Sequence, residues 1–253
     1  MALSGLFGTF LFAALILMFL PLVGGLMVVA ALPLLSLVMM MGCAAIMRGQ
    51  VAPPSLLLAP FRAQTERRNR LLGLCGLYAA ATLAVMLASD GLDGGKFNEL
   101  QALMASGMDT EEQKQQAQAL LEDPSLRGAV FLRLALTGLV SIPFWYAPAL
   151  VWWAQQGVAQ SLFSSVLALW RSKGAFAVYL LTWFGVIALG GGLLGAGLQA
   201  LGAGQLLSLL VMPLGLTLSV VFYVSLYFMF VQTFGSAEPS RTDEDAEELN
   251  PPA

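Results

Sequence analysis

Residues 145–173, WYAPALVWWAQQGVAQSLFSSVLALWRSK, join an aromatic, apolar stretch to the basic pair Arg171 and Lys173 through an amphipathic segment. Tryptophan and tyrosine gather at membrane–water interfaces, whereas lysine and arginine are retained on the cytoplasmic side. The pattern predicts that one membrane span ends near Trp153 and that the next begins after Lys173. A shorter stretch with the same order, GQVAPPSLLLAPFR at residues 49–62, predicts a second hairpin connection of the same kind.

The composition of the whole chain agrees with this pattern. Of the 253 residues, 58% are hydrophobic and 11% are charged, and the mean hydropathy is +0.79. These values are typical of a polytopic membrane protein, so we predict an all-α fold with about six transmembrane helices. The chain has no His, and Cys43 and Cys75 lie in apolar runs. We therefore expect packing roles for both thiols, and no disulfide framework, zinc site or cofactor.

The first 47 residues carry no charged side chain. A single helix of that length would be roughly twice as long as a bilayer core of about 30 Å is thick, so the chain must fold back. Pro21, Gly24 and Gly25 supply the turn. A cleaved signal peptide fits less well, because the basic n-region is missing and the apolar run continues too far. We predict one domain over residues 1–234, with spans near 3–20, 24–46, 71–88, 129–154, 174–200 and 205–232.

The distribution of cations predicts the orientation of these spans. Connection 48–70 holds five arginines, and connection 155–173 holds Arg171 and Lys173, so we expect both connections and both termini in the cytoplasm. Residues 89–128 would form a periplasmic loop in a Gram-negative host, with helices near 96–106 and 109–122. The acidic residues 235–253 would form a disordered cytoplasmic tail. The predicted topology and interface anchors are Arg48, Arg62, Arg67, Arg68, Arg70, Trp145, Trp152, Trp153, Trp170, Arg171 and Lys173.

The amphipathic segment Val158–Trp170 has helical periodicity and predicts an interfacial helix. Its apolar positions are expected to form one face, leaving a second face that is rich in serine. A serine-rich face favours a structural connector between spans over a helix that senses anionic lipid. Its counterpart at residues 53–61 is expected to start at Pro53 and to stop at Pro60. The two hairpins would then form a parallel repeat. The apolar positions are Val158, Ala159, Leu162, Phe163, Val166, Leu167 and Trp170, and the polar ones are Gln160, Ser161, Ser164 and Ser165.

Few ionisable groups fall within the predicted spans. Only Arg133 does, close enough to the interface for its stem to snorkel, which we favour over a substrate-binding role. None of the fifteen Asp and Glu residues is expected in a span, which argues against carboxylate-based proton or cation coupling. Kinks at Pro143, Pro148 and Pro213 are expected to be relieved by neighbouring helices. The glycines at 190–197 lack the Lys-Ser or Lys-Thr of a phosphate loop, so we interpret them as helix-packing residues.

These features favour two functions. The first is a non-enzymatic structural or accessory membrane protein, in contact with the lipid bilayer and with a possible protein partner bound through loop 89–128 or the acidic tail. The second is a transporter or permease for a small solute. A transporter needs polar groups that converge at mid-depth, so scattered positions for Tyr78, Thr137, Ser141, Ser208 and Thr217 would count against it. Catalysis is disfavoured because no nucleophile has a neighbouring base. Nucleic-acid binding is disfavoured because topology alone explains the arginines.

Several motifs together resemble an uncharacterised family of bacterial inner-membrane proteins. They are FWYAPAL at 144–150, SLFSS at 161–165, WRSKGAF at 170–176 with Val178 and Tyr179, and APFR at 59–62. The resemblance covers most of the chain and implies a small, helical, multi-span protein of the inner membrane. It carries over no catalytic or binding residue. The family has a basic, aromatic stretch before its first span, where this sequence begins almost directly with the apolar residues 3–7.

Overall fold

The computed structural model describes residues 2–20, 23–105, 110–203 and 205–235, which form helices and no strand. Five helical segments are long and apolar enough to cross a membrane, and the 17-residue apolar helix α1 is a shorter sixth. The all-α fold with about six spans is thus confirmed. The predicted acidic tail lies outside the described residues. The elements are α1 Ala2–Met18, α2 Gly24–Met47, η1 Pro54–Leu58, α3 Ala59–Arg62, α4 Thr65–Asp93, α5 Lys96–Ala105, α6 Glu111–Glu122, α7 Pro124–Phe144, α8 Ala147–Trp153, α9 Val158–Arg171, α10 Lys173–Gly185, η2 Val186–Gly190, α11 Gly191–Ala200 and α12 Gln205–Phe234.

The turn between α1 and α2 depends on a glycine. A Cβ atom built on Gly24 would lie 2.0 Å from the carbonyl oxygen of Leu17, whereas one built on Gly25 meets nothing within 4 Å. Only glycine allows the backbones of the two helices to approach this closely. The predicted fold-back of the first apolar run is confirmed, because α1 ends at Met18 and α2 begins at Gly24.

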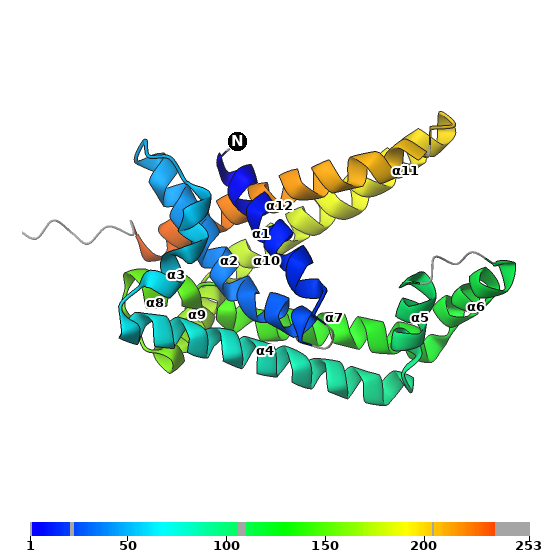
Figure 1. Cartoon of the computed structure of the whole chain (residues 1–253), viewed down its shortest axis with the longest axis horizontal. Helices are drawn as coiled ribbons and strands as arrows, with labels where there is room; N and C mark the ends of the chain where they lie inside the picture. The colour runs from blue at the N-terminus through cyan, green and yellow to red at the C-terminus, as the bar shows by residue number, and fades with distance from the viewer. Residues whose placement is uncertain (1, 21–22, 106–109, 204, 236–253) are drawn as a thin grey trace, which may run out of the picture.

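Helix α2 lies at the centre of the bundle and packs against α1, α4, α8 and α12. Figure 1 shows α3, α8 and α9 at one end of the molecule and α5 and α6 at the other, with the α10–α12 hairpin diverging from the α4–α7 pair. We call the first end the basic end, because connections 48–70 and 155–173 both lie there. The assignment of this end to the cytoplasm remains our prediction from the charges.

A buried cluster joins the spans α2 and α12 to α8 and α9 at the basic end. Met40 of α2, Leu150 of α8, Leu169 of α9 and Phe230 of α12 belong to one buried cluster. Cys43 lies in that cluster as a buried free thiol, and Cys75 lies in the neighbouring cluster of α2, α4 and α8. Both thiols therefore pack among apolar side chains, as expected.

Three predicted spans are not the single helices with the predicted bounds, because one is longer and two are interrupted. The third span is part of α4, which extends from Thr65 to Asp93 and so continues through polar residues at both ends. The fourth is broken between α7 and α8, and the fifth contains the π-helical segment η2 between α10 and α11.

Pro60 does not stop a helix, contrary to our prediction for residues 53–61. It lies in the first turn of α3, where its missing N–H is tolerated.

The glycines of the fifth span do not pack as predicted. A Cβ atom built on Gly190, Gly191, Gly192 or Gly197 meets no atom within 4 Å. Close helix packing by these residues is therefore absent within the described part of the chain. Their surroundings within the protein are open because the part of the hairpin that holds them extends away from the α4–α7 pair (Figure 1).

The hydrophilic loop folds into two helices with a small core of their own, which contains Leu100 of α5, Ala117 of α6 and Leu126 of α7. The predicted helices are confirmed within a few residues, and Thr110 forms a capping box with Gln113 at the start of α6. Asp109, predicted to open that helix, lies outside the described residues.

The start of α7 is held by Asp123. Its carboxylate accepts hydrogen bonds from the backbone N–H of Ser125 at 2.8 Å and from the Lys96 ammonium at 2.5 Å. The ammonium and the Ser125 groups stabilise the charged carboxylate, so they hold the pKa of Asp123 well below its usual range. This ion pair ties α5 to the start of the fourth span.

Candidate functional site

The fourth span unwinds at Trp145 and Tyr146, between α7 and α8. Pro148 lacks an N–H and its ring would clash with the carbonyl of residue 144 in a continuous helix, which explains why α7 ends at Phe144. Ser165 of α9 forms hydrogen bonds with the backbone groups that the break leaves without a helical partner. The Tyr146 N–H donates to Ser165 Oγ at 3.1 Å, and Ser165 Oγ donates to the carbonyl of Ile142 at 3.4 Å. The break is thus satisfied by a neighbouring helix, as predicted for the prolines.

Our prediction gave α9 an apolar face and a serine-rich face without saying which of the two the protein covers. Its helical extent is confirmed, but Ser161 and Ser165 are fully buried against α7 and α8, while Phe163 and Trp170 are 68% and 70% exposed. The physical reason is the solvent: in a membrane, apolar side chains face lipid and hydroxyls face backbone groups that lack partners. Packing of α9 against α7 and α8 agrees with a structural connector.

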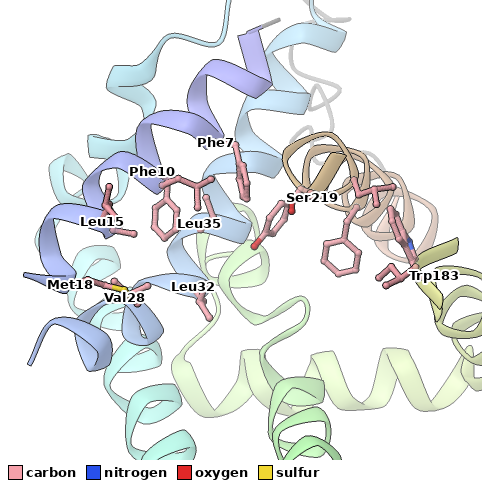
Figure 2. Close-up of a pocket in the computed structure, with 16 residues that line it drawn as sticks. Phe7, Phe10, Leu15, Met18, Val28, Leu32, Leu35, Trp183 and Ser219 are labelled. Atoms are coloured by element: carbon pink, nitrogen blue, oxygen red, sulfur yellow. The ribbon is translucent and has the colours of Figure 1, made fainter. Parts of the chain in front are cut away.

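An apolar cavity of about 670 Å³ opens between α1, α2, α10 and α12, and we call it the outer cavity. Figure 2 shows Phe7, Phe10, Leu15 and Met18 along one side, with Trp183 and Ser219 across from them. The remaining lining residues are Leu11, Ala14, Val28, Leu32, Leu35, Ile187, Gly215, Leu218, Phe222 and Tyr223. The volume falls in the range of about 300–1,000 Å³ that small-molecule sites occupy.

A smaller cavity of about 170 Å³, the inner recess, adjoins the outer cavity and shares Leu32, Phe222 and Tyr223 with it. Its polar groups come from Ser36, Tyr78, Ser141 and Trp145, and the apolar Pro33, Phe144 and Leu226 also line it. The Tyr78 hydroxyl lies 3.5 Å from Ser141 Oγ, and Ser141 donates to the carbonyl of Thr137.

Polar groups therefore converge only in part. Tyr78 and Ser141 meet in the inner recess, and Thr137 contributes its backbone carbonyl. Thr217 is elsewhere, with an exposed side chain that donates to Pro213. The side chain of Ser208 is outside the described part of the structure.

The walls of the two cavities limit their chemistry. Among the described residues, no Asp, Glu, Lys, Arg or Cys lines either cavity. Rings form much of the shared wall: Trp183 contacts Phe222 at a centroid distance of 5.4 Å, and Tyr223 contacts Phe7 at 5.9 Å. The walls can therefore hold an uncharged, largely apolar molecule, and the inner recess offers it hydroxyl and indole hydrogen-bonding groups.

Two acidic residues lie in the helix of the third span, outside the bounds 71–88 that we predicted for the span itself. The third candidate span covers Thr65–Leu92 and includes Glu66 near its start and Asp90 near its end. Arg133 Nη2 is 3.8 Å from Asp90 Oδ1, and its guanidinium carbon lies 4.5 Å from the centre of the Phe97 ring. Arg133 is thus paired within the protein and does not depend on snorkelling alone.

Some predicted anchors link the two connections at the basic end. Arg70 donates to the carbonyl of Gln155 at 2.5 Å and pairs with Glu66, and the Arg67 guanidinium lies over the Trp152 ring at 5.1 Å. Gln155 has a positive φ of 52°, a conformation that this bond helps to hold. The start of the third span is thereby fastened to the loop before α9.

The other predicted anchors have different surroundings. Trp153 stacks on Phe230 at 5.3 Å, Lys173 lies over Trp170 at 5.3 Å, and Arg48 Nε donates to Ala44. Arg62 and Arg171 are exposed, and Arg68 is half-buried.

Trp145 lies among rings, including Phe176 at 5.1 Å and Phe222 at 5.8 Å, and its indole nitrogen is buried. That position does not favour an interface anchor, which needs an indole N–H at the membrane surface. The anchoring roles of the other residues stay predictions.

Two groups of residues were missed by sequence reasoning. The outer cavity is lined by ordinary apolar side chains from four helices, and nothing distinguishes these from lipid-facing residues in a sequence. Asp90 was missed because the hydropathy of the third apolar run ends before it, whereas the helix continues to Asp93.

This protein is a polytopic helical membrane protein, as its helical bundle, its apolar spans and the outer cavity between them indicate. Over 236 residues the sequence is 33% identical to a probable inner membrane protein of Burkholderia thailandensis, an alignment that covers 92% of this chain and 84% of that protein. The chain therefore belongs to this family of probable inner membrane proteins. No family model matches the sequence, and no solved structure matches it.

Proposed function

We propose that this protein is a non-enzymatic accessory protein of the inner membrane that binds a lipid-type molecule in the outer cavity. The observation that carries the proposal is an apolar cavity of about 670 Å³ built from four membrane-spanning helices. A hydrocarbon chain matches its walls, because these present aliphatic and aromatic side chains and no charged group among the described residues.

The inner recess supports the same proposal. A hydrocarbon chain that fills the outer cavity and extends past Phe222 and Tyr223 would place its polar end near Tyr78 and Ser141. These hydroxyls can hydrogen-bond a small uncharged head, such as an alcohol or an ester carbonyl. The ligand class is therefore an acyl or isoprenoid chain with a neutral polar end.

The non-enzymatic part of the proposal is supported by the residue types. The chain has no His. Tyr78 and Ser141 face each other, and in the described part of the recess no acidic or basic side chain lies beside them to act as a general base.

Photolabelling tests lipid binding in the outer cavity. The protein is reconstituted in nanodiscs that contain a small fraction of a long-chain alcohol with a diazirine in its hydrocarbon chain, and the labelled residues are mapped by mass spectrometry. We expect labels on residues of α1 and α12 that line the cavity, such as Leu15 and Leu218. Labels spread evenly over all lipid-facing helices would contradict the proposal.

A matched pair of glycine substitutions sharpens this test. Gly215 lines the cavity and Gly138 of α7 does not, and a Cβ atom at either position meets nothing within 4 Å. Gly215→Leu should therefore fill part of the cavity and lower labelling there severalfold, whereas Gly138→Leu should leave it unchanged. Equal labelling in both variants would show that the cavity does not hold the lipid.

Passage of a small solute is a second candidate, favoured by the meeting of Tyr78 and Ser141 beside the unwound segment at Trp145. Unwound backbone at depth is common where transporters bind substrate. Uptake into proteoliposomes tests it: a solute flux that falls in Ser141→Ala and persists in Gly215→Leu would favour transport over lipid binding.

An accessory role also predicts a protein partner, for which α5 and α6 are the available surface. These helices have their own small core with the start of α7. A specific partner recovered from detergent extracts should be lost when residues 96–122 are replaced by a short linker. Recovery that does not depend on these residues would count against this surface.

A further inference from the structure

A third cavity, of about 600 Å³, lies at the basic end where α9, the start of α10 and the last turn of α12 meet. It is distinct from the outer cavity, with which it shares no lining residue. Its walls carry one cation and several hydrogen-bonding side chains. The residues that matter for its chemistry are Ser164, Arg171, Ser172, Ala175, Gln232 and Thr233.

The charge of this cavity is positive. Arg171 lines it, and among the described residues no acidic side chain does so or forms an ion pair with Arg171. Lys173 lies nearby, over the Trp170 ring. Since a guanidinium presents five N–H donors in a planar fork that matches phosphate oxygens, the cavity suits a phosphate group.

The start of α10 adds to this preference for an anion. Ser172 is the N-cap residue, but its hydroxyl donates to the carbonyl of Ala168 and does not cap the helix. The first turn of this 13-residue helix therefore has no side-chain cap, and Ala175 of that turn lines the cavity. Uncapped N–H groups at a helix N-terminus favour a negatively charged ligand.

The surface beside the cavity is apolar. Phe163, Val166, Leu167 and Trp170 form the exposed face of α9, and Leu167 also lines the cavity. A ligand that places an anionic group at Arg171 would therefore have hydrocarbon-compatible surface directly next to it. This arrangement fits a lipid and not a free anion.

We propose that this cavity binds the headgroup of an anionic glycerophospholipid, with the phosphate at Arg171 and the acyl chains along the exposed face of α9. Ser164, Gln232 and Thr233 then contact the polar groups around the phosphate. The proposal does not rest on lipid binding in the outer cavity, because the two cavities and their ligand charges differ.

Native mass spectrometry of the full-length protein in detergent tests the proposal. The probe is dioleoyl phosphatidylglycerol, compared with the phosphatidylcholine of the same acyl chains and with water-soluble glycerophosphoglycerol. We expect phosphatidylglycerol to bind at least about fivefold more tightly than phosphatidylcholine, since only the former adds net negative charge at Arg171. Equal binding of both lipids, or equal binding of the soluble headgroup, would overturn the proposal.

Two arginine variants separate this cavity from general attraction to the basic end. Arg171→Gln should weaken phosphatidylglycerol binding about tenfold, the effect of losing a charge-assisted hydrogen bond. Arg62→Gln removes the same charge from an exposed residue of α3 that does not line the cavity, and it should change binding less than about twofold. Equal effects of both variants would overturn the proposal.

Three further measurements keep the test decisive. Arg171→Lys retains the charge without the fork and should give an intermediate affinity, which guards against misfolding of the glutamine variant. Gly215→Leu should leave phosphatidylglycerol binding unchanged. Phosphatidylglycerol could instead bind only after removal of residues 236–253, with those residues cross-linked to α9 in the full chain. That result would show that the acidic tail is the ligand of the cavity, and it would overturn the proposal.

Discussion

Ser165→Ala should destabilise the protein because Ser165 supports the break in the fourth span. The hydroxyl accepts from the Tyr146 N–H at 3.1 Å and donates to the Ile142 carbonyl at 3.4 Å. The Ile142 carbonyl still accepts a hydrogen bond from the Trp145 N–H at 3.2 Å, so removal of the Ser165 hydroxyl costs little at that carbonyl. The Tyr146 N–H belongs to a fully buried residue, and within the described part of the chain it would be left without a hydrogen-bond partner.

The expected cost follows from that orphaned donor. A buried N–H without a partner costs about 1–3 kcal/mol, so we expect a loss of about 2 kcal/mol in the free energy of unfolding. Ser161→Ala is the matched control, because Ser161 is equally buried but donates only to Val158 of its own helix. The control should change stability by less than about 0.5 kcal/mol, since alanine favours the helix.

Reversible unfolding in mixed micelles, followed by far-ultraviolet circular dichroism, measures both variants. The difference between them isolates the hydrogen bonds across the break, because each substitution removes one hydroxyl from a buried position on the same face of α9. Equal stabilities would refute the argument that Ser165 satisfies the unwound backbone.

Three other perturbations have definite expected outcomes. Gly24→Ala should lose about 2–3 kcal/mol of stability because its new methyl group meets a carbonyl of α1, whereas Gly25→Ala should be neutral or mildly stabilising; similar values in thermal unfolding would contradict the role of the turn. Arg133→Met should lower the free energy of unfolding by about 1–2 kcal/mol, between the values for exposed and buried ion pairs. Adding Asp90→Asn should recover most of that loss, and no recovery in the double variant would show that the two side chains do not interact. The pKa of Asp123 is lowered in the folded protein, so the Asp123 carboxylate stabilises the fold above the ordinary carboxyl pKa of about 4, and this stabilisation declines as the pH falls below that value. Asp123→Asn should flatten the decline of stability at low pH. The same pH profile in both proteins would show that the bond from Asp123 to α5 contributes little.

Sequence patterns were sufficient where local chemistry determines the backbone. The fold-back near Gly24 follows from a proline and glycines within an uncharged run too long for one span. Gly94 and Gly95, directly after α4, have φ values of 64° and 85°, a left-handed conformation that glycine adopts readily at the end of a helix. Such features need no knowledge of distant residues.

Sequence patterns failed where a partner in another helix decides the outcome. The serines of α9 were expected to form one face of the helix, but the spacing did not say that Ser165 faces inward and bonds the backbone groups at the break in the fourth span. Asp90 remains in a long apolar helix because Arg133 lies opposite it. Neither partner can be recognised from spacing along the chain.

The cavities were also beyond sequence reasoning. Phe10, Leu218 and Trp183 are residue types that any lipid-facing surface contains, and they enclose a volume only because α1, α2, α10 and α12 are arranged around it. Their importance is therefore a property of helix arrangement and not of residue type.

The π-helical segment Val186–Gly190 changes the phase of the fifth span. A π turn holds one residue more than an α turn, so the helix beyond it is rotated by about 100° relative to an uninterrupted α-helix. Trp183, before the segment, faces the outer cavity, whereas Gly191 and Gly192, beyond it, face away from the protein. One inserted residue thus lets a single span present one surface to the bundle and another to its surroundings, and deletion of Ala188 would merge the two phases into one.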